Sequence, residues 1–543
     1  MPAPELILAG GRIRTLDETR PQATAVAIDR GRFVAVGGEE LRSQAGPATE
    51  LRELAGATVV PGLVDAHNHL LHTGAMLAQV QLYDCRSLDE ILRLVAERVA
   101  TTPTGAWVIG RGWDESLLVE RRHPTRHDLD AAAPDNPVVL FRVWNKLTCN
   151  SAALRLAGID RSTPDPPAGS LYAGSFERDG QGEPTGLFRD RAKELIERHL
   201  PTPDEDELVA SIETACRAYN RVGITAVGEP GLWPHEIRAF HRARREGRLT
   251  VRTDMMMAGW GFGSPETEAG LEERFEGVGV SGGFGDELLR LEGIKLMPDG
   301  GLGDRTARML DPYPGGSGDR GQWVVAPDEL PQRIRFCHDL GFPVDCHTCG
   351  DECQQVIVRA YAAAQEASPK PWLRHRVHHA YFPTGETLEL MTRYRIPALV
   401  SSPFIRNLGE SYVVSVGEER AGGVMPMRTY LDRGIPLAGS SDSPITDFDP
   451  WVGMTAAATR ATVAGRVLGA GERLSAEEAL RSYTVGGAYA TGRELSVGSI
   501  APGKLADLVL LDRDPLAVDP AELLAVRVEA TMLGGRWVFE GAP

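Results

Sequence analysis

The sequence has no uninterrupted apolar stretch of membrane-spanning length, although 42% of its 543 residues are hydrophobic. A helix that crosses a bilayer needs about 18 or more apolar residues in a row. The start, Met1 to Glu5, also lacks the basic residues and the apolar segment of a secretory signal. We therefore expect a cytoplasmic protein that does not interact with a membrane.

Basic clusters are missing as well, and the formal net charge is −17. A protein that binds nucleic acid or an anionic surface normally presents clustered Lys and Arg. No nucleic-acid partner is therefore expected, and a small-molecule substrate is the better prediction. A homodimer is a reasonable expectation for a large enzyme.

Cysteine is scarce, with seven residues scattered through the chain. An odd number without regular spacing does not predict a disulfide framework, so we expect reduced thiols. Cys346 and Cys349 form a Cys-x-x-Cys pair, which is found in redox sites and in structural zinc sites. A structural zinc site needs a second ligand pair at comparable spacing, and none follows in the sequence. If His347 points into a site, Cys346 points away from it, and a buried apolar role is sufficient.

The length exceeds what one hydrophobic core usually holds, so more than one domain is expected. Short apolar runs separated by turn residues occur near both ends of the chain, which indicates strands joined by hairpins. We predict that residues 1–57 and 490–543 together form a small β-sandwich domain. Residues 58–489 would form the second domain, with residues 70–205 as an insertion that covers its site.

The middle of the chain alternates short apolar runs with segments of helix length. Alternating β and α segments predict a parallel sheet, and eight units favour a closed (β/α)8 barrel of the TIM type. The predicted strands are residues 59–65, 223–227, 251–257, 291–297, 343–347, 376–380, 397–401 and 435–440.

The first of these strands runs into His67-Asn68-His69. Residues two apart on a strand point to the same side, so both imidazoles can face one metal ion. In a (β/α)8 barrel the site lies at the carboxyl ends of the strands. The other polar residues at predicted strand ends are Lys295, Asp299, His347, His378, His379 and Asp442. Their convergence predicts a metal site, although Lys295 could instead pair with Asp299.

At this point the chain resembles the amidohydrolase superfamily, and within it the amidohydrolase-3 group of YtcJ-like proteins and N-substituted formamide deformylases. The resemblance spans nearly the whole chain. It rests on the motifs at residues 61–69, 111–115, 293–307, 347–351, 374–380, 439–444 and 498–508.

The resemblance implies a role for each matching residue. His67, His69 and Asp442 would bind one divalent metal, and His347 and His379 a second. Lys295, modified by carbon dioxide to a carboxylysine, would bridge them. Asp442 would also be the catalytic acid and base. Zinc suits these ligands, but manganese, iron, cobalt or nickel would too.

The substrate-binding candidates are less specific. Trp113 is a candidate wall of the site or a packed aromatic of the insertion. Asp299 and Arg305 could contact the substrate, and Arg305 could equally make a structural ion pair. His378 stands where the family commonly has Glu, and strand alternation places it on the side opposite to His379.

The resulting prediction is a metal-dependent hydrolase of a carbon–nitrogen bond other than a peptide bond, in an amide, an N-substituted formamide or a cyclic amide. The same metal-activated water could instead deaminate a substrate or open an ester or lactone. A non-catalytic regulatory or binding protein on the same scaffold is the alternative from another class.

Overall fold

The computed structural model describes residues 3–115, 117–142, 146–165, 174–263, 265–315 and 318–541. It divides into two compact units, residues 1–73 with 212–543, and residues 74–211. Within the described ranges, no helix combines the length and the apolar character required to cross a membrane.

The first unit contains a parallel sheet of eight strands that follow one another in chain order. They are β6 (Leu63–Asp65), β13 (Ile224–Leu232), β14 (Arg252–Ala258), β16 (Leu289–Leu296), β17 (Val344–His347), β18 (Arg376–His378), β19 (Ala398–Val400) and β20 (Leu437–Gly439). A short strand, β15 (Phe284–Gly285), pairs with β16 outside this order. The backbone N–H of Ala66 donates to the carbonyl of Gly439 at 3.1 Å, which links the last strand to the first. The predicted barrel is therefore confirmed.

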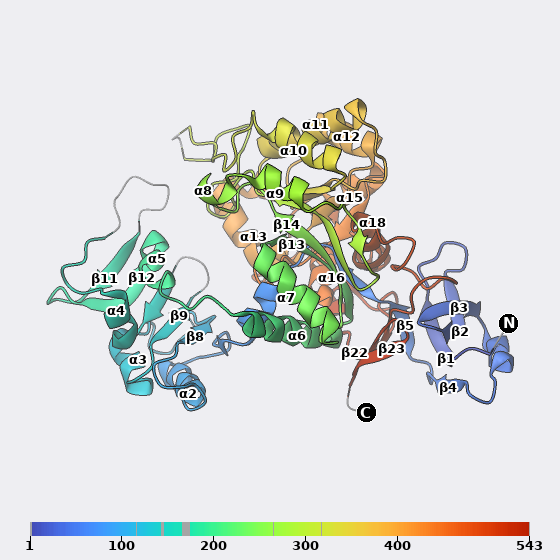
Figure 1. Ribbon diagram of the computed structural model, residues 1–543, viewed down its shortest axis with the longest axis horizontal. Helices are drawn as coiled ribbons and strands as arrows, with labels where there is room; N and C mark the ends of the chain where they lie inside the picture. Colours follow the sequence, from blue (N-terminus) through green and yellow to red (C-terminus); the bar gives the residue numbers. More distant parts are fainter. Residues whose placement is uncertain are drawn as a thin grey trace. The chain divides into compact units, whose positions relative to one another are not determined.

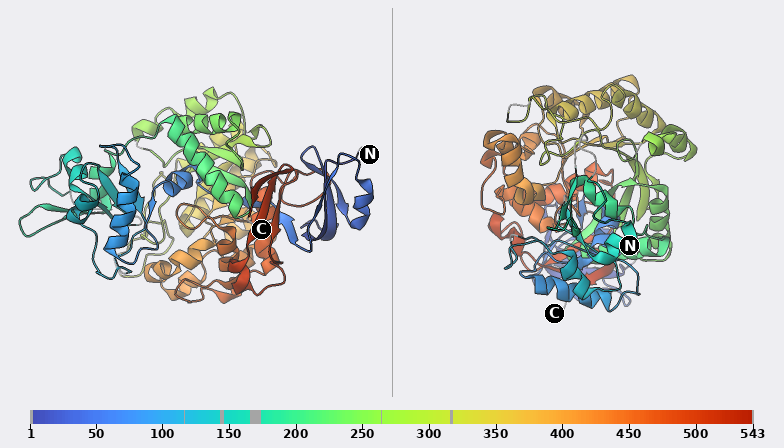
Figure 2. Two further views of the ribbon diagram at one scale, coloured as in Figure 1. Left: turned by 90° about the horizontal axis from the view of Figure 1, so that it is seen from below. Right: turned by 90° about the vertical axis from the view of Figure 1, so that its left-hand side faces the viewer.

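Helices on the outside of this sheet explain why its strands are apolar on both faces. All seven residues of β14 are buried, as expected when a parallel sheet is covered by helices. In the right-hand view of Figure 2 the green, yellow and orange helices surround the strands. These helices include α6 (Glu205–Arg221), α7 (Pro234–Arg245), α10 (Leu330–Leu340), α11 (Asp351–Ala367), α12 (Gly385–Tyr394), α13 (Pro403–Val416) and α16 (Pro450–Thr459).

Both ends of the chain meet in a second sheet of the same unit, as predicted (blue and red in Figure 1). Its path is β23-β22-β21-β5-β1-β2-β3, with β4 paired to β1. The strands are β1 (Leu6–Arg14), β2 (Gln22–Asp29), β3 (Arg32–Gly37), β4 (Glu50–Glu53), β5 (Thr58–Pro61), β21 (Leu508–Leu511), β22 (Val528–Leu533) and β23 (Arg536–Glu540). Arg252 of the barrel donates to both carboxylate oxygens of Asp507 at 2.6 and 2.7 Å, and so ties the two sheets together.

The predicted first strand, residues 59–65, is divided at Gly62. β5 belongs to the sheet of the chain ends and β6 to the barrel. The N–H of Gly62 donates to the backbone carbonyl of Asp507, whereas the N–H of Leu63 donates to the backbone carbonyl of Gly223. A side chain at position 62 would collide with Thr225, because its Cβ would lie 2.2 Å from the hydroxyl oxygen. Glycine thus permits the close approach at which the strand changes sheets.

The second unit, residues 74–211, has a sheet of its own with the order β11-β12-β10-β9-β8-β7. The strands are β7 (Val80–Gln81), β8 (Val108–Arg111), β9 (Val138–Phe141), β10 (Lys146–Cys149), β11 (Ser175–Arg178) and β12 (Pro184–Arg189). Its helices include α2 (Leu88–Val99), α3 (Arg126–Ala132) and α4 (Ser151–Ala157). Buried side chains of α2, α3 and these strands form its hydrophobic core.

Candidate metal centre

The predicted ligands lie at one rim of the barrel because all eight strands run parallel. β6 ends two residues before His67, β17 ends at His347, and β18 ends one residue before His379. Asp442 follows β20 by three residues. The carboxyl ends of parallel strands meet at the same edge, so four segments far apart in sequence bring their side chains together.

His67, His69 and Asp442 form the first cluster. The Nε2 atoms of His67 and His69 lie 3.4 and 3.3 Å from Oδ1 of Asp442. The N–H of Asp442 donates to the carbonyl of His67 at 3.0 Å, which joins the two loops directly. Burial acts to raise the pKa of Asp442, but hydrogen bonds from His67 and His69 hold that pKa well below its usual range. The carboxylate is therefore ionised.

His347 and His379 form the second cluster, next to the first. Nδ1 of His347 lies 3.1 Å from Nε2 of His379, and the same His379 nitrogen is 4.0 Å from Oδ2 of Asp442. Burial and the positive charge of Lys295 lower the pKa of His347 to about 4. A neutral imidazole keeps the lone pair that a metal ligand needs.

Lys295 does not pair with Asp299, the partner suggested by the sequence. Its Nζ lies 3.1 Å from Oδ1 of Asp345 and 3.3 Å from Nδ1 of His378. The other oxygen of Asp345 is 3.2 Å from Nδ1 of His67. Burial opposes ionisation of Asp345, but the positive charge of Lys295 and the contact with His67 place its pKa well below the usual range.

Asp345 is thus a residue of the centre that sequence reasoning missed. The signal for it was its position two residues before His347, because strand alternation turns both side chains to the same side. A carboxylate that accepts from the second nitrogen of a ligating imidazole fixes the orientation of the ring.

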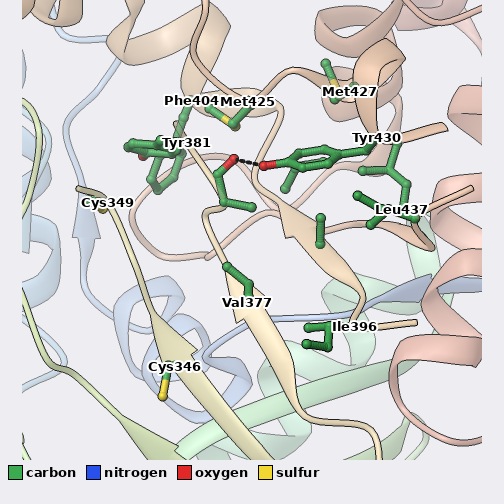
Figure 3. Packing of buried hydrophobic residues seen from close by; sticks show 14 of the residues in the cluster. Cys346, Cys349, Val377, Tyr381, Ile396, Phe404, Met425, Met427, Tyr430 and Leu437 are labelled. Carbon is green, nitrogen blue, oxygen red and sulfur yellow. Dashed lines mark hydrogen bonds between the residues drawn. The ribbon is translucent and has the colours of Figure 1, made fainter. Parts of the chain in front are cut away.

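His378 and His379 lie side by side, with ring centroids 3.8 Å apart, and the alternation expected from the sequence does not hold. β18 ends at His378, and His379 has a left-handed backbone with φ of 68°. Ala380 is also left-handed, and its carbonyl accepts from the Tyr430 hydroxyl at 2.7 Å (dashed in Figure 3). The His378 ring stacks on His67 with a centroid distance of 3.3 Å. A backbone that leaves the extended region no longer alternates its side chains.

The remaining substrate-binding candidates all make contacts within the protein. Trp113 is fully buried in the hydrophobic core of the second unit, which is the alternative left open above. Asp299 is fully buried and accepts from the backbone N–H groups of Arg308, Cys349 and Gly350. Arg305 donates to the backbone carbonyls of Pro314 and Val414 and is part of no described ion pair.

The donor set fits a divalent metal. Four groups each place one ligand atom per residue within 4.8 Å of one another: His67 with His69 and Asp442, His67 with Asp345 and His378, His378 with His379 and Asp442, and His347 with Cys349 and His379. Neutral imidazoles with a shared carboxylate are ligands that zinc and similar ions accept. The chemistry of the residues therefore agrees with a metal centre at this rim.

Comparisons with known proteins point the same way. A family model described as "Amidohydrolase family" matches residues 50–539. The chain is 31% identical over 542 residues to a putative amidohydrolase, YtcJ, of Bacillus subtilis, with 98% of each chain covered. It is 30% identical over 548 residues to an N-substituted formamide deformylase of Arthrobacter pascens, with 99% of this chain and 98% of the relative covered.

Solved structures agree with these sequence comparisons. The structure of an uncharacterized metal-dependent hydrolase from Pyrococcus furiosus is similar with a TM-score of 0.76 and 30% sequence identity. The similarity covers 94% of this chain and 99% of that one.

Proposed function

Because the chain belongs to the amidohydrolase family, we propose that it hydrolyses a carbon–nitrogen bond other than a peptide bond in a small molecule. Amides, N-substituted formamides and cyclic amides are the substrate classes. The observation that carries the proposal is the position of Asp442, whose carboxylate reaches ring nitrogens of both histidine clusters.

We assign the first metal position to His67, His69 and Asp442, and the second to His347 and His379. Zinc is the ion that this set suits best. A divalent ion at such a site lowers the pKa of a water molecule and polarises the carbonyl oxygen of a substrate. The neutral imidazoles supply lone pairs, while Asp442 balances part of the added positive charge.

Asp442 is also the group that moves protons. Its carboxylate is buried and ionised, so it can accept the proton of the attacking water and pass that proton to the departing nitrogen. The other proposed ligands of the first position are imidazoles, which leaves Asp442 as the one carboxylate of that set.

A carboxylysine at Lys295 stays a prediction. The reaction would join the neutral amine to carbon dioxide and release one proton, and the Lys295 amine lies 3.1 Å from Oδ1 of Asp345. His67, His69 and Asp442 do not depend on this modification. The metal content therefore separates a bridged pair of ions from a single ion.

Elemental analysis of the purified chain tests the proposal, before and after dialysis against a chelator. We expect one or two equivalents of zinc or a similar ion, and hydrolysis of amides or formamides that disappears with the metal and returns when it is restored. Asp442→Asn should lower the turnover rate by about 10²–10⁴-fold, whereas Asp339→Asn on the exposed end of α10, the matched control, should leave it unchanged. Turnover that survives complete metal removal would contradict the proposal.

A panel of matched substrates distinguishes the alternatives. Cleavage of an N-substituted formamide but not of the corresponding ester supports the proposed reaction. Faster cleavage of the ester or lactone, or release of ammonia from an aminated ring, would assign the same centre to the alternative reactions. A metal-loaded chain that turns over none of these would favour a binding protein.

A further inference from the structure

A sulfur atom lies beside the second histidine cluster. Sγ of Cys349 is 3.4 Å from Nε2 of His347. Cys349, His347 and His379 can each place a ligand atom within 4.8 Å of the other two. The Cys349 side chain is only 3% exposed, so its sulfur is held inside the rim rather than in solvent.

The loop after β17 fixes the position of this sulfur. The N–H and hydroxyl groups of Thr348 both donate to the carbonyl of His378, at 3.1 and 2.9 Å. The N–H groups of Cys349 and Gly350 donate to the buried carboxylate of Asp299, at 3.3 and 2.9 Å. The loop is therefore tied on one side to β18, which carries His378, and on the other to Asp299.

Two tyrosines, Tyr381 and Tyr412, lie near the thiol. The hydroxyls of Tyr381 and Tyr412 are 2.7 Å apart, and both side chains are buried. Cys349 and Tyr381 are labelled in Figure 3.

We infer that Cys349 is a third protein ligand of the metal ion held by His347 and His379. The inference rests on the proposed function, since it completes the second metal position. Catalytic zinc sites characteristically have three protein ligands and one open position, and two imidazoles with one thiolate are such a set. The bond forms between Sγ and the metal, and the thiol proton passes to solvent.

This ligand set has a consequence for metal choice. A thiolate is a soft ligand that favours zinc over magnesium or manganese. The second position would then be selective for soft ions, whereas the first position has only nitrogen and oxygen donors. Cys349 would complete the second position whether or not Lys295 carries a carboxyl group.

The neighbouring cysteines provide matched controls. Cys353, on α11, contacts the backbone carbonyl of His347 at 3.9 Å rather than its ring. Cys346 precedes His347 on β17 and is buried in the hydrophobic core of the barrel, at a distance from Cys349 in Figure 3. Neither belongs to a described group that could hold a metal.

X-ray absorption at the zinc edge of the full-length, zinc-loaded chain tests the inference. The expected spectrum contains a sulfur scatterer at about 2.3 Å in addition to nitrogen and oxygen at about 2.0–2.2 Å. The sulfur contribution should be lost in Cys349→Ser and retained in Cys353→Ser.

The possible spectra distinguish a failure of the Cys349 inference from a failure of the proposed function. Bound zinc in the wild-type chain with nitrogen and oxygen scatterers alone would overturn the role of Cys349 and leave the proposed function standing. A sulfur signal that persists in Cys349→Ser would also overturn it. A chain that binds no metal would refute the proposed function as well. The wild-type spectrum is sufficient for this decision if a variant does not fold.

Discussion

Replacement of Asp345 is the sharpest test of how the centre is held together. The carboxylate is fully buried between Lys295 at 3.1 Å and His67 at 3.2 Å. Two unit charges at that separation attract by about 5 kcal/mol at an effective dielectric constant of about 20. Loss of one partner from a buried ion pair leaves the other charge uncompensated, at a cost of about 3–5 kcal/mol. We expect Asp345→Asn to lower the free energy of unfolding by this amount.

The same substitution should weaken metal binding for a separate reason. The carbonyl of the new amide side chain can accept one hydrogen bond, but it no longer carries the charge that orients the His67 ring. Loss of a group that orients a ligating imidazole costs about 10–100-fold in metal affinity. Chelator competition on the folded protein measures this effect, and denaturant titration measures stability.

A second substitution separates the two effects. Lys295→Met combined with Asp345→Asn removes both charges of this pair, so part of the lost stability should return while the metal affinity stays low. The buried guanidinium of Arg376, 3.9 Å from Asp345, keeps its charge in both variants. The reasoning would be refuted if Asp345→Asn unfolded at the wild-type denaturant concentration. In that case the carboxylate would not balance the charge of Lys295.

Three further substitutions test single features. Asp442→Asn should keep a metal by elemental analysis but lower the turnover rate by about 10²–10⁴-fold, because the proton acceptor is lost; near-normal turnover would exclude the assigned role. Tyr430→Phe leaves the buried carbonyl of Ala380 without its donor and should lower the free energy of unfolding by about 1–3 kcal/mol, and an unchanged denaturation midpoint would contradict this. Burial raises the pKa of Asp449 to about 6 from 3.8, so its stabilising contribution is complete below about pH 4 and is lost as the pH rises through about 6. Asp449→Asn should therefore lose less stability than wild type between these pH values, and identical pH profiles in denaturant titrations would show that this carboxyl does not titrate as described.

The strand order and the gathering of polar residues at one rim could be predicted because both depend on local pattern. Apolar runs separated by helix-length segments define parallel strands, and polar residues at their ends define the rim. His67 and His69 illustrate this, since their spacing alone places them together. Both lie beside Asp442 in the structure.

The contacts of Lys295 and His378 could not be predicted in the same way. Which carboxylate faces Lys295 depends on the register between β16 and β17, and that register pairs Lys295 with Asp345. The position of the His378 ring depends on the left-handed backbone at His379. Glycine and asparagine are the residues that usually adopt this conformation, so a histidine at this position gives no sign of it in the sequence. Trp113 was ambiguous for another reason, because a large aromatic suits a core and a pocket wall equally.

The sheet that joins both chain ends cannot be completed until the C-terminal strands have been synthesised. β5, at residues 58–61, pairs with β21, at residues 508–511, and β21 continues the sheet to β22 and β23. A ribosome synthesises nearly the whole barrel before it reaches β21. Until then, the edge of β5 that pairs with β21 is unpaired. Exposed edges invite pairing with other chains. We therefore expect chains truncated before residue 508 to aggregate through their first 61 residues, even though the strands of the barrel are complete.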